Sequence, residues 1–131
     1  MHTFGMLRGL VQMRVLLVED EEPIRSIIAE ELREAGYEVV EASDGDEAMA
    51  LLEPPADAFR MLITDIHMPG REDGIGVATA FRRSHPDQPL IFTTGRPEAL
   101  DRIGTLGSHE ALLLKPYRPR QLIAAMKRLT V

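Results

Sequence analysis

The chain of 131 residues contains no cysteine and no tryptophan. Without cysteine it has neither a disulfide framework nor a thiolate metal site, which suits a reducing compartment. No apolar run approaches the roughly 20 residues that a membrane span needs, and no signal-peptide pattern opens the chain. We therefore expect a cytoplasmic protein with no membrane partner.

Basic residues are in the minority, with 15 Lys and Arg against 21 Asp and Glu and a formal net charge of -6. This balance argues against nucleic acid as the direct partner. The length fits one domain, and 44% hydrophobic and 27% charged residues are ordinary for a globular one. Because Met13 would serve well as a start, we expect residues 1–12 to form a flexible N-terminal arm and residues 13–131 to form the domain.

Short apolar runs alternate with helical patterns five times along the chain. Strands are predicted at residues 14–18, 38–42, 60–64, 89–94 and 111–115. A capping-box pattern, Asp44 with Glu47, opens the second helix, and the helix between the fourth and fifth strands is the weakest because Gly104 and Gly107 interrupt it. The alternation predicts an α/β fold, a doubly wound five-stranded parallel sheet in the order 2-1-3-4-5.

Polar side chains follow four of these strands at the point where each ends. They are Glu19 and Asp20, Asp65, Thr94 and Lys115. Because the carboxyl ends of parallel strands meet at one edge of the sheet, we expect these side chains to lie together. Hard carboxylate oxygens suit Mg²⁺. Three acids so close repel one another, so at least one of their pKa values should rise when no cation is bound.

This grouping indicates a magnesium-dependent phosphoacceptor built around Asp65, since aspartate carboxylates form acyl phosphates. Lys115, a mobile point charge, would neutralise one phosphoryl oxygen, and the Thr94 hydroxyl would donate a hydrogen bond to another. The spacing Asp65-x-His67 looks like a short chelate, but histidine is a poor ligand for magnesium. We therefore expect His67 to offer its backbone carbonyl, with its imidazole pointing outward. Each residue alone has a simpler explanation as a turn or loop residue; their order and strand-end placement together are more specific.

Four segments resemble the receiver domain of two-component response regulators, over nearly all of residues 13–131. They read VLLVEDE at 15–21, ITDIHMPG at 63–70, TG at 94–95 and LKPY at 114–117. The resemblance implies a flavodoxin-like fold. It also implies that Asp20 binds magnesium beside Glu19, and that the carbonyl of His67 is a further metal ligand. Asp65 would be the phosphoacceptor.

The resemblance further implies that Thr94 and Lys115 hold the phosphoryl group. Two features depart from the family. The loop at 68–74 has one residue more than the usual Met-Pro-x-x-Asp-Gly, and Leu112 stands where an aromatic switch residue is usual. Output is therefore expected to run through the weak fourth helix or Tyr117. The loop and the segment 91–95 also look like a subgroup of single-domain regulators from alphaproteobacteria.

The leading hypothesis is a single-domain response regulator, a monomer or weak dimer. It would take its phosphoryl group from a sensor histidine kinase or a histidine phosphotransfer protein and act on a downstream protein target. It would be no enzyme, although it would assist its own phosphorylation and dephosphorylation. Three alternatives stay open. They are a phosphate sink or relay without output, a receiver excised from a hybrid kinase or longer regulator, and an aspartate-nucleophile phosphohydrolase of the haloacid dehalogenase type.

Overall fold

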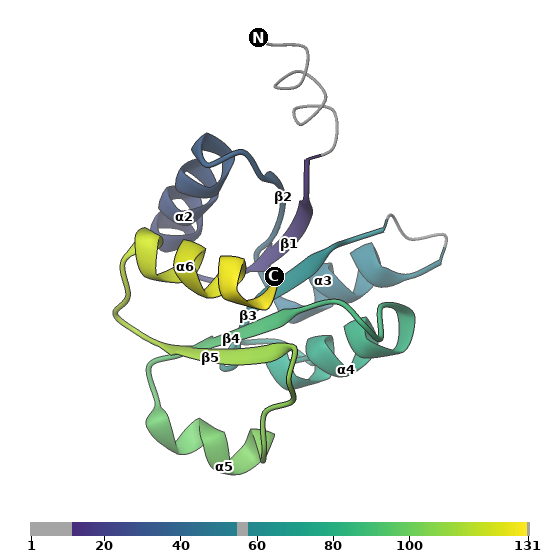
Figure 1. Ribbon diagram of the computed structural model, residues 1–131. Coiled ribbons are helices and arrows are strands. Elements are labelled where there is room, and N and C mark those ends of the chain that lie inside the picture. The colour runs from purple at the N-terminus through teal and green to yellow at the C-terminus, as the bar shows by residue number, and fades with distance from the viewer. Residues whose placement is uncertain (1–11, 55–57, 131) are drawn as a thin grey trace, which may run out of the picture.

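The computed structural model describes residues 12–54 and 58–130, and its centre is a parallel sheet of five strands (Figure 1). The strands lie in the order β2 (Glu38–Ala42), β1 (Arg14–Val18), β3 (Met61–Asp65), β4 (Leu90–Thr94) and β5 (Glu110–Leu114). The predicted α/β fold and strand order are thus confirmed, and strand boundaries move by no more than one residue. The predicted N-terminal arm, apart from Gln12, lies outside the described residues.

Helices cover both faces of the sheet, and each face has its own core. On one face lie α2 (Glu22–Glu34) and α6 (Pro119–Leu129), and on the other α3 (Gly45–Leu52) and α4 (Gly74–Ser84) (Figure 1). The central strands β1 and β3 are buried over nearly their whole length, which is why they read as continuous apolar runs. Within the described residues no helix is long and apolar enough to cross a membrane.

The α3 helix begins as the sequence predicts, with one difference in its cap. The Asp44 carboxylate accepts the Glu47 N–H at 2.8 Å, which satisfies one of the free donors of the first turn. The Glu47 carboxylate returns to Ser43, accepting from its backbone N–H at 2.5 Å and its hydroxyl at 3.1 Å, and not to Asp44. The backbone of Asp44 is extended, with φ −158° and ψ 176°, and its neighbour Ser43 donates the reciprocal bond.

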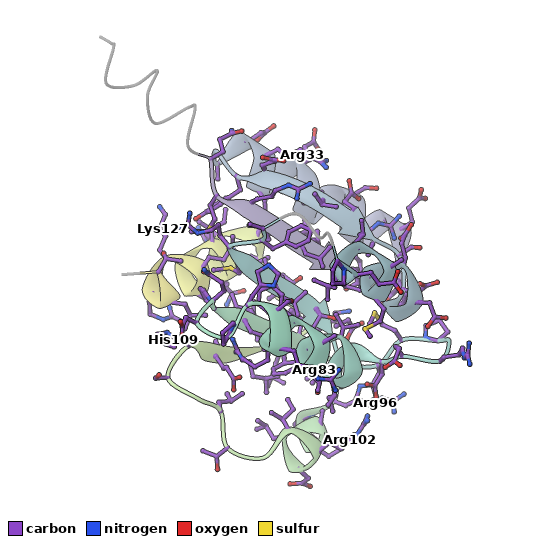
Figure 2. The ribbon with its side chains drawn as sticks, turned by 90° about the vertical axis from the view of Figure 1, so that its right-hand side faces the viewer. Arg33, Arg83, Arg96, Arg102, His109 and Lys127 are labelled. Carbon is purple, nitrogen blue, oxygen red and sulfur yellow. The ribbon has the colours of Figure 1, made fainter. Side chains whose placement is uncertain are left out.

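The segment between β4 and β5 contains little regular structure, as its glycines predict. A 3₁₀ turn, η1 (Pro97–Ala99), leads into a single helical turn, α5 (Leu100–Ile103), which ends at Gly104 with φ +78°. Arg102 donates from Nη2 to Asp73 Oδ2 at 2.6 Å and so ties α5 to the residue before α4. Figure 2 labels Arg96 and Arg102 on the side of the molecule where α5 lies.

Candidate functional site

An ion-paired cluster lies at the carboxyl edge of the sheet, where β1, β3 and β5 end. The Lys115 ammonium lies 2.8 Å from Glu19 Oε1 and 2.9 Å from Asp65 Oδ2. Glu19 is only 3% exposed and Asp65 6%, so both carboxylates are held largely out of water. Lys115 follows β5, two strands away from β3, and its long side chain reaches across the end of β4 to make both contacts.

Asp20 completes a group of three carboxylates. One oxygen from each of Glu19, Asp20 and Asp65 lies within 4.8 Å of the others. Asp20 is half-buried, and among the described residues no side chain or backbone donor holds its carboxylate. Lys115 therefore pairs with only two of the three carboxylates, and the remaining negative charge and hard oxygen donors match a small divalent cation such as Mg²⁺. The donor set fits the metal predicted from the sequence.

Burial shapes the protonation of this cluster. It raises the pKa of the Glu19 carboxyl, although the hydrogen bonds from Lys115 and the Glu21 N–H oppose the rise. The predicted rise in one acid is thus confirmed in direction, but burial is its main cause and repulsion from Asp65 the smallest contribution. Burial would lower the pKa of Lys115, yet its bonds to the two carboxylates outweigh this and hold the pKa above its ordinary value. Lys115 is therefore a fixed positive charge at neutral pH.

Thr94 lies beside the cluster without joining it. Its side chain is fully buried, and its hydroxyl accepts the Arg96 N–H at 3.0 Å. The same hydroxyl is 3.4 Å from Nδ1 of His67, so the imidazole lies against Thr94 and does not simply point outward as expected. The carbonyl of Thr94 accepts the Lys115 N–H at 2.8 Å, which joins the two strand ends. Thr94 follows Thr93, which pairs in register with Asp65, and His67 comes two residues after Asp65. Thr94 and His67 are therefore near Asp65, and contacts of their own hold them in place.

The loop after β3 packs tightly against the backbone of Asp65. Gly74 donates its N–H to the Ile66 carbonyl at 2.9 Å. A Cβ at Gly74 would lie only 1.9 Å from the Asp65 carbonyl oxygen, so this position requires glycine. Asp73 then caps α4 by accepting the N–H groups of Ile75 and Gly76 at 3.0 and 3.1 Å. The longer loop thus packs against the backbone of Asp65 and restricts its position.

Sequence reasoning missed Arg25 on α2. Its Nη1 donates to the Glu19 carbonyl at 2.9 Å and its Nε to Glu41 Oε1 at 3.2 Å. In the sequence Arg25 looks like any arginine on the polar side of a helix. Its partner Glu41 is 16 residues away on β2, so only the folded chain reveals the pair.

The fold and the pocket together define a class. The chain is a flavodoxin-like α/β domain whose acidic pocket lies at the switch point between β1 and β3, where such sheets bind their ligands. The chain belongs to the response regulator receiver domain family, whose model matches residues 15–127.

Relatives and solved structures agree with this assignment. A relative from Bacillus subtilis, named as the uncharacterized transcriptional regulatory protein YrkP, is 37% identical over 123 residues, which cover 90% of this chain and 51% of YrkP. The chain thus spans about half the length of that relative. A response regulator receiver protein from Sinorhizobium medicae superposes with a TM-score of 0.83 at 28% identity, over 92% of this chain and 95% of its own. The response regulator TrrA of Thermotoga maritima, solved with Mg²⁺ and BeF, superposes with a TM-score of 0.75 at 30% identity. The match covers 90% of this chain and 99% of the TrrA chain.

Proposed function

We propose that this chain accepts a phosphoryl group on Asp65 from a phosphohistidine of a sensor histidine kinase or a histidine phosphotransfer protein, in the cytoplasm. One observation supports this most strongly. The Lys115 ammonium bridges the buried Asp65 and Glu19 carboxylates at the sheet edge, with Asp20 within reach of both. Phosphoryl transfer depends mainly on such positioning and neutralisation of charge.

In the transfer step an oxygen of the Asp65 carboxylate attacks phosphorus, and the P–N bond of the phosphohistidine breaks. The donor imidazole leaves with the bonding electron pair, and Asp65 becomes an acyl phosphate. Lys115 turns from Asp65 to the new phosphoryl oxygens while it keeps its charge. Before transfer the Thr94 hydroxyl accepts the Arg96 N–H. After transfer it rotates to donate a hydrogen bond to another phosphoryl oxygen.

Magnesium would be held by Asp20, Asp65 and the carbonyl of His67, with Glu19 beside them, and when bound it supplies positive charge that offsets the phosphoryl oxygens. The Mg²⁺ and BeF bound to TrrA support the same cofactor here. Within this chain, Glu19 has a different task from Asp20. Its two carboxylate oxygens are already engaged by Lys115 and the Glu21 N–H, so it fixes the lysine in place.

The surface next to Lys115 suits a protein donor. A hollow of about 410 Å³ opens there between α2 and the turn after β5, and its lining is mostly apolar. Ile24, Pro116 and Tyr117 contribute to this lining. Ile27, on the exposed side of the same helix, leaves 56% of its surface to solvent. An apolar surface next to the phosphoacceptor favours docking of a protein phosphodonor over phosphorylation by small phosphodonors alone.

The proposal is tested by phosphoryl labelling. Acetyl phosphate and a phosphorylated histidine kinase are each offered to the chain with and without Mg²⁺, and the labelled residue is mapped by mass spectrometry. Label is expected on Asp65, only with Mg²⁺, and none in Asp65→Asn. The control Asp87→Asn removes an exposed carboxylate and should label normally. Label that persists in Asp65→Asn would refute the proposal.

Leu112 favours a second candidate, a phosphate sink without its own output. In this chain Leu112 pairs in register with Phe92 and packs half-buried against the core. It has no ring that turns between two positions. Partners captured from a lysate are compared for the chain with and without beryllofluoride. An unchanged set of partners favours the sink, and partners gained with beryllofluoride favour a regulator with output.

A further inference from the structure

Arg25 joins the acidic pocket to β2. Its guanidinium donates to the carbonyl of Glu19 and to the carboxylate of Glu41, and its side chain is only 15% exposed. Glu41 is held on its other oxygen by Arg33, whose Nη1 lies 3.2 Å away. Arg25 therefore occupies a defined position between the turn after β1 and the end of β2.

The bond to the Glu19 carbonyl acts on Asp20. A peptide unit is planar, so the carbonyl of Glu19 and the N–H of Asp20 turn together. The preceding peptide is already fixed, because the Glu19 N–H donates to the Ala42 carbonyl at 3.1 Å. The Asp20 carboxylate has no hydrogen-bond partner in the described part of the chain. The backbone therefore sets the point from which this side chain extends into the pocket, and Arg25 holds that backbone.

We propose that Arg25 is a positioning residue that presents Asp20 to the divalent cation, with Glu41 holding Arg25 in place. The inference rests on the proposed function, since it takes the pocket of Glu19, Asp20 and Asp65 as the metal site. Partners behind a metal ligand that fix its orientation affect metal affinity by about 10–100-fold when removed. The Arg25 contact lies one peptide unit behind Asp20, so we expect a loss of about tenfold.

If Arg25 acted only through its charge, its removal would change the Mg²⁺ affinity in the opposite direction. A guanidinium next to the pocket repels a second cation, so a purely electrostatic role would let Mg²⁺ bind more tightly once Arg25 is removed. A positioning role makes Mg²⁺ bind more weakly after the same change. The sign of the change in affinity therefore decides between the two.

Arg33 provides a matched control on the same helix. It pairs with the same glutamate, and its Nη2 donates to the Val39 carbonyl near the beginning of β2, away from the pocket. Figure 2 shows Arg33 well apart from Arg96, which follows the carboxyl end of β4. Arg33→Met removes the same charge and one partner of Glu41, but no contact to Glu19.

The experiment titrates Mg²⁺ alone into the full chain by isothermal calorimetry. Arg25→Met is expected to raise the Kd for Mg²⁺ about tenfold, and Arg33→Met to leave it unchanged within error. Arg25→Lys keeps the charge but loses the planar fork that serves two acceptors, so it is expected to weaken binding as well. Urea unfolding in EDTA shows that each variant is folded; if Arg25→Met is not, Arg25→Lys decides the question.

Tighter or unchanged Mg²⁺ binding in Arg25→Met would overturn the inference, as would an equal loss in Arg33→Met. If Arg25→Met does not fold, an unchanged Kd for Mg²⁺ in Arg25→Lys would also overturn the inference. The proposed function fails separately, when the native chain binds Mg²⁺ but Asp65 takes no label. In that case the Kd values of the Arg25 variants still test the positioning role.

Discussion

Lys115→Met removes the single ammonium that lies between two buried carboxylates. Glu19 and Asp65 are 3% and 6% exposed, so each loses a charged partner that water replaces poorly. Breaking a buried ion pair costs about 3–5 kcal/mol. The lysine side chain is itself 18% exposed, so we expect the lower end, about 3 kcal/mol. With a urea dependence of about 2 kcal/mol per M, the unfolding midpoint should fall by about 1.5 M.

The assay is urea unfolding followed by circular dichroism, first in EDTA and then in excess Mg²⁺. Mg²⁺ at about 100 times its Kd stabilises a protein by about 2.7 kcal/mol. Mg²⁺ should stabilise Lys115→Met more than it stabilises the native chain, because the lysine charge no longer opposes binding of the ion. The difference in unfolding free energy between the two chains should therefore narrow when Mg²⁺ is added.

Lys127→Met is the control. Lys127 is the only other lysine of the chain, and it is exposed near the end of α6 (Figure 2). Its loss should cost less than about 1 kcal/mol, as is usual for exposed charges, and should not depend on Mg²⁺. A similarly small loss of unfolding free energy in Lys115→Met, or a loss that is the same with and without Mg²⁺, would refute the reasoning. It would show that Lys115 does not offset the negative charge of the three carboxylates.

Two further predictions concern groups outside the ion-paired cluster. His85 Nε2 accepts the buried Phe59 N–H at 3.1 Å, which requires a neutral ring, and burial lowers the pKa of His85. This stability is present above about pH 6.5 and is lost as the pH falls through the lowered pKa. The free energy that separates the native chain from His85→Leu should thus be about 1–3 kcal/mol at neutral pH and shrink towards about pH 5; a constant difference across that range contradicts the assignment. Gly74→Ala places a methyl group against the Asp65 carbonyl oxygen and should cost about 1–3 kcal/mol and reduce labelling of Asp65. Gly107→Ala, which meets only the Glu110 side chain, is its control, and equal stabilities for the two variants would show that the loop tolerates the contact.

The order of the strands and the side chains at their ends could be predicted because both follow from local pattern. Apolar runs such as 15–18 that alternate with helical patterns are typical of a parallel sheet covered on both faces, and the crossover rule then limits the strand order. The cap at Asp44 follows from a bond that spans three residues. The weakness of the helix between β4 and β5 is also anticipated, because glycines interrupt its segment.

Contacts between distant residues could not be predicted in detail. The sequence places Thr94 next to a phosphoryl group, but the hydroxyl here accepts the Arg96 N–H, and His67 lies against it. Arg25 carries no local feature that distinguishes it from a solvated arginine. Its role depends on Glu41, which reaches it only when β2 lies beside β1.

The sequence by itself determined that this chain folds as a parallel α/β domain and which side chains stand at the strand ends, because both follow from periodicity along the chain, and its motifs supplied the resemblance to receiver domains. Only the tertiary structure decided how those side chains share charge. Lys115 pairs with two of the three carboxylates. Burial raises the pKa of Glu19, and Arg25 donates to the carbonyl of the peptide before Asp20. Burial and distances of a few ångströms set the strength of these interactions, and both exist only after residues far apart in the chain have packed together.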